Sequence, residues 1–172
     1  MRLILETKRL IIRETNIGDA DSIFDLHTNE NVQKYTGEPM PNSLQEVKEG
    51  LNKHAEENFV KRGFGRWAVI YKPHNKLIGW SGLKYLPVFN EIDLGYRFFP
   101  EYWGMGIATE TAVPIVKYGF DVLKLQRIIG IAMQENVASI NVLKKAGMTF
   151  DKLAPYDEGG VDVEWYSVEN IS

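Results

Sequence analysis

The stretch EYWGMGIATE, residues 101–110, places two glycines, an alanine and a threonine within positions 104–109, between a strand-like run and a helical one. A dinucleotide-binding G-x-G-x-x-G sequence would need glycine where Thr109 stands, and a P-loop would need lysine after Gly106. Two interpretations remain. One is a strand-to-helix turn with positive φ. The other is a cradle in which backbone N–H groups and the positive end of a helix hold a pyrophosphate.

The segments around this stretch predict one α+β domain over residues 1–172. Before it, β-branched and aromatic runs separated by turn residues predict an antiparallel meander of three strands. After it, a helix, a continuous apolar strand, a second helix and two closing strands follow. The predicted strands are 8–14, 66–71, 76–86, 91–99, 126–133 and, last, 161–169, and the predicted helices are 19–29, 43–63, 106–123 and 136–147.

Capping residues mark the helix ends. Asp19 is placed to begin the first helix, and Ser43 with Glu46 three residues on predicts a capping box, closed by Gly63. Pro114 lies inside the helix after the glycines and removes one hydrogen bond, which predicts a kink or an interruption there.

Composition excludes several function classes. The chain has 44% hydrophobic and 25% charged residues, as an ordinary globular protein has. It lacks cysteine, and its three histidines are scattered, so neither disulfides nor a metal site is expected. A net charge of −3 without a basic stripe argues against nucleic acid, and the N-terminal segment resembles neither a signal peptide nor a membrane span. We expect a cytoplasmic protein, and the sequence leaves a homodimer open.

At WGMGIA, residues 103–108, the sequence resembles the GNAT superfamily of acetyl-CoA-dependent N-acetyltransferases, whose phosphate-binding pattern is Q/R-x-x-G-x-G/A. Trp103 departs from the leading Gln or Arg. The stretches ETKRLIIRE, EIDLGYRFFPEYW and ENVASINVLKKAGM resemble the branch that contains the ribosomal-protein N-terminal alanine and serine acetyltransferases. The resemblance spans nearly the whole chain, and its motifs occur in the family's order.

This resemblance implies a mixed, mostly antiparallel sheet flanked by helices, with two splayed strands that hold acetyl-CoA. The pantetheine would bond to the backbone of residues 96–98, opposite residues 130–133, and the pyrophosphate would lie on the N–H groups of residues 104–109. Asn136 would contact the cofactor, cap a helix, or do both. The implied cofactor-binding residues are Tyr96, Arg97, Phe98, Trp103, Gly104, Met105, Gly106, Ile107, Ala108, Thr109, Asn136 and Asn141.

Attack of an amine on a thioester needs a neutral amine, and an amine like that of lysine costs about 3 kcal/mol more to deprotonate than an α-amine. Strand alternation puts Glu91 and Asp93 on one face as candidate bases, or as a solvated or ion-paired face. Many family members protonate the leaving thiolate with a tyrosine at a position that is Leu143 here. Ser139 remains as the candidate donor, unless it only makes a local backbone bond.

Four aromatic residues are candidates for an acceptor pocket, with the core as the alternative for each. The early helices and the loop KYTGEPMPN, residues 34–42, would decide which amine binds. The resemblance implies acetyl transfer to a protein N-terminus or a small-molecule amine, and the alternative is a non-catalytic acyl-CoA sensor on the same fold. The candidate acceptor-binding residues are Tyr35, Trp67, Trp80 and Tyr85.

Overall fold

The computed structural model describes residues 1–171, which form an eight-stranded sheet with helices on both faces. The strand order is β1-β2-β3-β4-β5-β6-β8-β7, and every neighbouring pair is antiparallel except β5–β6. The predicted fold class is confirmed. The strands are β1 (Leu3–Glu6), β2 (Leu10–Arg13), β3 (Arg66–Tyr71), β4 (Lys76–Leu86), β5 (Glu91–Phe98), β6 (Arg127–Ala132), β7 (Thr149–Pro155) and β8 (Asp162–Glu169).

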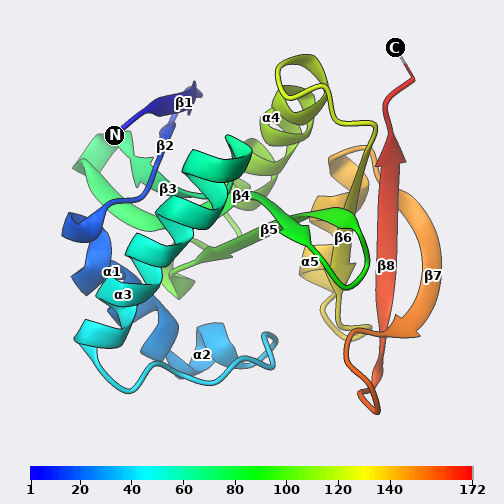
Figure 1. Ribbon diagram of the computed structural model, residues 1–172, viewed down its shortest axis with the longest axis horizontal. Helices are drawn as coiled ribbons and strands as arrows, with labels where there is room; N and C mark the ends of the chain where they lie inside the picture. The colour runs from blue at the N-terminus through cyan, green and yellow to red at the C-terminus, as the bar shows by residue number, and fades with distance from the viewer. Residues whose placement is uncertain (172) are drawn as a thin grey trace.

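Alternation along β3 shows how the two faces are covered. Trp67 and Val69 point into a core with residues of α4 and α5, whereas Ala68 and Ile70 pack with residues of α1 and α3. Figure 1 shows α1 and α3 together over the half of the sheet that holds β3 and β4. The helices are α1 (Ala20–Thr28), α2 (Glu30–Gln33), α3 (Leu44–His54), α4 (Ile107–Asp121) and α5 (Val137–Lys145).

The predicted helix ends differ from those observed in two places. Asn16, not Asp19, caps the turn before α1, and the Asp19 carboxylate pairs with Arg13. The Ser43 hydroxyl accepts the Glu46 N–H as expected, but no return bond closes a box.

The interior of two helices also differs from the prediction. The helix predicted over 43–63 is α3 followed by a π-helical segment (Ala55–Val60). Helix α4 runs unbroken through Pro114, so the predicted interruption does not occur. Two short elements, β1 and α2, were not predicted, because four residues carry too little periodicity.

The sheet opens at its centre, between β5 and β6. A single residue pair, Asp93 with Ile129, joins these two parallel strands, and beyond it they separate. Their backbones there have no ladder partner, which leaves N–H and C=O groups available to a ligand. The sheet therefore provides a site between its two halves.

Candidate active site

A cleft of about 1020 Å³ occupies the opening between β5 and β6. Its walls come from β5, β6, the N-terminal ends of α4 and α5, and the loop after α2. Thirteen of the residues predicted from the sequence line it: Asp93, Tyr96, Arg97, Phe98, Trp103, Gly104, Gly106, Ile107, Ala108, Thr109, Asn136, Ser139 and Asn141, together with Tyr35 and Trp80 from the acceptor set.

The glycine-rich turn ends against this cleft. Gly104 has φ 71° and Gly106 has φ 76°, so both glycines are required by the backbone itself. A Cβ at Gly104 would meet no atom within 4 Å, and one at Gly106 would meet only Arg9, at 3.9 Å. No side chain caps α4, whose first N–H groups precede its first i→i−4 bond, from Glu110 to Gly106. Space and free donors here fit a pyrophosphate.

A polar network that the sequence did not predict secures this turn. Arg9 donates from Nε to Glu110 at 2.7 Å and from Nη2 to the Met105 carbonyl at 2.9 Å, and Thr7 donates to Glu110 at 2.5 Å. Burial alone would raise the pKa of Glu110, but the bonds from Thr7 and Arg9 lower it. Arg9 thereby neutralises a carboxylate in the first turn of α4, where an anion would otherwise be repelled.

Where the family places its tyrosine, Leu143 is buried in the core. A different tyrosine, on β5, contacts Ser139: the Tyr96 hydroxyl lies 2.7 Å from Ser139 Oγ and 3.0 Å from the Ser139 carbonyl. Burial raises the pKa of Tyr96 to about 12, so this phenol keeps its proton. Asn136 caps α5 by accepting the Ser139 N–H at 3.2 Å, which fixes the serine at the cleft.

The two candidate bases occupy different surroundings. Asp93 lines the cleft, its side chain is 13% exposed, and it accepts a bond of 2.5 Å from Arg66. Burial raises the pKa of Asp93 more than Arg66 lowers it. Glu91 does not line the cleft and pairs with Arg127 at 3.0 Å. Of the two carboxylates, only Asp93 is placed to act on an acceptor.

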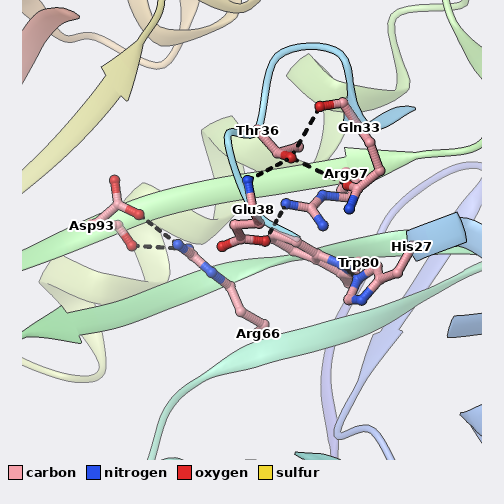
Figure 2. Close-up of polar contacts among 8 residues, drawn as sticks. All are labelled: His27, Gln33, Thr36, Glu38, Arg66, Trp80, Asp93 and Arg97. Carbon is pink, nitrogen blue, oxygen red and sulfur yellow. Dashed lines mark hydrogen bonds and ion pairs between the residues drawn. The ribbon is translucent and has the colours of Figure 1, made fainter. Parts of the chain in front are cut away.

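On the same face of β5, charged side chains surround Trp80 (Figure 2). The guanidinium carbons of Arg66 and Arg97 lie 5.3 and 5.1 Å from its ring centroid. Arg97 donates to Glu38 at 2.8 Å. The Trp80 indole N–H donates to His27 at 3.1 Å, and burial, with help from Arg97, lowers the pKa of His27 to about 4.

Three further predicted residues lie off the cleft. Trp67 is fully buried in the core between the sheet and α4. Tyr85 hydrogen bonds to Asn90 and has Arg62 over its ring. Met105 belongs to the turn, and its carbonyl bonds to Arg9. Trp67 and Tyr85 are therefore removed from the predicted acceptor residues. Alternation along β3 and β4 turns them toward the core with α4 and α5, whereas Trp80 lies on the opposite face of the sheet.

Residues 9–149 match the model of the Acetyltransferase (GNAT) domain, and the chain belongs to this family. It is 34% identical to the uncharacterized N-acetyltransferase YoaA of Bacillus subtilis over 84% of this chain and 81% of that protein. It is 32% identical to YnaD, another uncharacterized N-acetyltransferase of that organism, over 95% of each. The chain is an N-acetyltransferase, and the alternative of a non-catalytic sensor is not favoured.

Solved structures show the same fold. A GNAT-family acetyltransferase from Bacillus anthracis superimposes with a TM-score of 0.83 at 25% identity, over 99% of this chain and 100% of that one. Spermidine N-acetyltransferase from Vibrio cholerae, solved with CoA and spermine, gives 0.79 at 23% over 95% and 97%. A ribosomal-protein alanine acetyltransferase from Vibrio fischeri gives 0.81 at 22% over 98% and 97%.

Residues 1–171 contain neither a membrane-spanning helix nor a cluster of metal-binding side chains. None of their helices has the length and apolar character needed to cross a bilayer. Their histidine, aspartate and glutamate side chains form no group of three that could hold a metal ion. The family uses acetyl-CoA and an amine, and the groups available to bind both are those of the residues that line the cleft.

Proposed function

We propose that this N-acetyltransferase transfers the acetyl group of acetyl-CoA to a primary amine by direct attack on the thioester, in a single domain over residues 1–172. The observation that supports it most is the continuous cleft from the turn at Gly104 and Gly106 to Asp93, across the single residue pair of β5 and β6. A cysteine-free chain suits the reducing cytoplasm, where we place it.

The cofactor would lie along the cleft with its pyrophosphate on the turn and its pantetheine against the unpaired backbone of Tyr96 to Phe98. Acetyl-CoA supplies an activated acyl group. The turn supplies N–H donors, and Arg9 removes the opposing charge of Glu110. The residues proposed to hold it are Tyr96, Arg97, Phe98, Trp103, Gly104, Met105, Gly106, Ile107, Ala108, Thr109, Asn136 and Asn141.

Ser139 would donate its hydroxyl proton to the leaving thiolate, with Tyr96 behind it. Their 2.7 Å contact allows Tyr96 to donate to Ser139 Oγ instead of to the Ser139 carbonyl at 3.0 Å, which turns the serine proton toward the cleft. Tyr96 is thus a positioning residue, and it takes the role that the missing tyrosine at Leu143 leaves open.

Asp93 would accept a proton from the amine, directly or through a water. Its raised pKa brings it nearer to neutral pH, which improves a general base. Arg66 fixes the carboxylate and balances its charge. Glu91, the other candidate, is bound to Arg127 outside the cleft and would act at most through the local charge.

The acceptor is a protein N-terminus or a small amine. Similarity to the ribosomal-protein branch supports the first, and the spermidine enzyme among the neighbours supports the second. A homodimer is compatible with either. Tyr35 and Trp80 remain in the proposed acceptor site, whereas Trp67 and Tyr85 face the other core and are not part of it.

Thiol release from acetyl-CoA, measured against peptides with different first residues and against small amines, tests this function. We expect release that depends on the amine and an acetylated product by mass spectrometry. Release without any amine dependence would contradict transfer and leave only hydrolysis.

A further inference from the structure

Arg97 has more hydrogen-bonding capacity than the protein uses. Its side chain is only 9% exposed and lines the cleft. A guanidinium has five N–H donors. Within residues 1–171, the Arg97 guanidinium makes one hydrogen bond, from Nη2 to Glu38 Oε2 at 2.8 Å. A largely buried guanidinium with unused donors facing a cleft is suited to bind an oxyanion.

The Glu38 carboxylate, which pairs with Arg97, can be displaced by a ligand. It lies in the loop between α2 and α3, its side chain is 62% exposed, and Figure 2 shows it reaching over Trp80 to Arg97. Burial would raise the pKa of Glu38, but Arg97 lowers it. An exposed carboxylate loses little when it returns to water, so a ligand carboxylate can replace it.

The cations near Trp80 differ in how many of their donors the protein already uses. Arg66, Arg97 and Lys84 line this part of the cleft, against Glu38 and Asp93. Arg66 makes three hydrogen bonds, one to the Asp93 carboxylate and two to backbone carbonyls, whereas Arg97 makes one. Within residues 1–171, Arg97 makes one hydrogen bond and the exposed Lys84 makes none, so both cations have unused donors, and Arg97 is the more buried of the two.

Building on the proposed function, we infer that the acceptor is a primary amine that carries a carboxylate, and that this carboxylate binds Arg97 in place of Glu38. Arg66 and Arg97 contact one indole ring, so the amine beside Asp93 and the carboxylate on Arg97 are bridged by a short linker. Free amino acids and peptides with an acidic residue near the N-terminus share this chemistry.

Matched acceptors test the inference. One arm compares free amino acids of increasing chain length with their carboxamides, a second compares C-terminally amidated peptides with Asp or Asn at the second position, and a third uses spermidine. We expect kcat/KM to favour the carboxylate by roughly 10- to 100-fold in the first or second arm. The carboxamide has the more easily deprotonated amine, so protonation cannot explain a loss.

Two variants address the residues directly. Arg97→Gln should bring the carboxylate-to-carboxamide ratio close to one, whereas Arg62→Gln, which removes an arginine stacked on Tyr85 outside the cleft, should not. Glu38→Gln changes an exposed side chain and should tighten binding of the carboxylate acceptor severalfold, read by calorimetry without acetyl-CoA.

Three results would overturn the inference. They are equal or better kcat/KM for carboxamides and spermidine, weaker acceptor binding in Glu38→Gln, or an unchanged ratio in Arg97→Gln. Thiol release with carboxyl-free amines alone would leave the proposed function standing. No release with any amine would overturn both.

Discussion

Removing the two hydroxyls at the thiolate end of the cleft tests the catalytic proposal most directly. Ser139→Ala deletes the proposed donor, and kcat should fall by roughly 10- to 100-fold, because a thiolate already leaves with some ease. Tyr96→Phe keeps the Ser139 hydroxyl but removes its 2.7 Å partner. One neutral hydrogen bond is worth about 1 kcal/mol, so a loss of about fivefold is expected.

The double variant tests whether Tyr96 and Ser139 act together or independently. If Tyr96 acts only through Ser139, Ser139→Ala with Tyr96→Phe should be no slower than Ser139→Ala alone. Thiol release at saturating acetyl-CoA gives kcat, and calorimetry should show the same acetyl-CoA affinity in all four proteins.

Two outcomes would refute this reasoning. Wild-type turnover in Ser139→Ala would make the serine structural. Losses that multiply in the double variant would make Tyr96 an independent donor. Thermal unfolding of Tyr96→Phe provides the control, since losing one partly buried hydrogen bond should cost only about 1 kcal/mol of stability.

Gly106→Glu should abolish acetyl-CoA binding measured by calorimetry, whereas Gly106→Ala, which adds only strain at φ 76°, should weaken it less. An acetyl-CoA affinity equal to that of the wild type in Gly106→Glu would contradict pyrophosphate binding at this turn. Asp93→Asn should lower kcat/KM most at low pH and recover as pH rises, while Glu91→Gln, outside the cleft, should follow wild type; parallel profiles for all three would exclude Asp93 as base. His27 and His54 have pKa values lowered from 6.5 to about 4, mainly by burial, so their contribution to folding stability is complete above about pH 6.5 and is lost as pH falls toward 4. On going from about pH 7 to about pH 5.5, each histidine should lower the free energy of unfolding, measured with denaturant, by about 1 kcal/mol. His54→Gln should reduce this dependence of stability on pH, and an unchanged dependence would contradict a neutral, buried His54.

Local patterns predicted the strands and the cleft's backbone elements well. The runs at 66–71 and 76–86 coincide with β3 and β4, because β-branched and aromatic runs bounded by turn residues delimit a strand within its own sequence. The glycine turn was found for the same reason, since a positive φ demands a particular residue. Helix α4 through Pro114 shows the limit: packing of both flanking turns on the core maintains a helix that propensity alone would interrupt.

The side-chain partners could not be predicted in this way. Arg9 meets Glu110 across 101 residues, Tyr96 meets Ser139 across 43, and Arg97 meets Glu38 across 59. Each contact depends on the sheet order and on how far the loop after α2 reaches, and neither leaves a periodic trace in one sequence. The family pattern led to Ser139, but it did not lead to the tyrosine that supports it from another strand.

The division of labour along β5 follows from the two-residue period of a strand. Tyr96 and Phe98 face the core with α4 and α5, on the side of Ser139, while Asp93 and Arg97 face Arg66 and Trp80 on the acceptor side. The strand separates from β6 just beyond Asp93, so both faces open into one cleft. A one-residue shift of β5 against β4 would exchange the two sets and put Asp93 on the face that now holds Tyr96. The paired register of eight residues between β4 and β5, from Gly79–Phe98 to Leu86–Glu91, therefore keeps Tyr96 on the face toward Ser139 and Asp93 on the face toward Arg66.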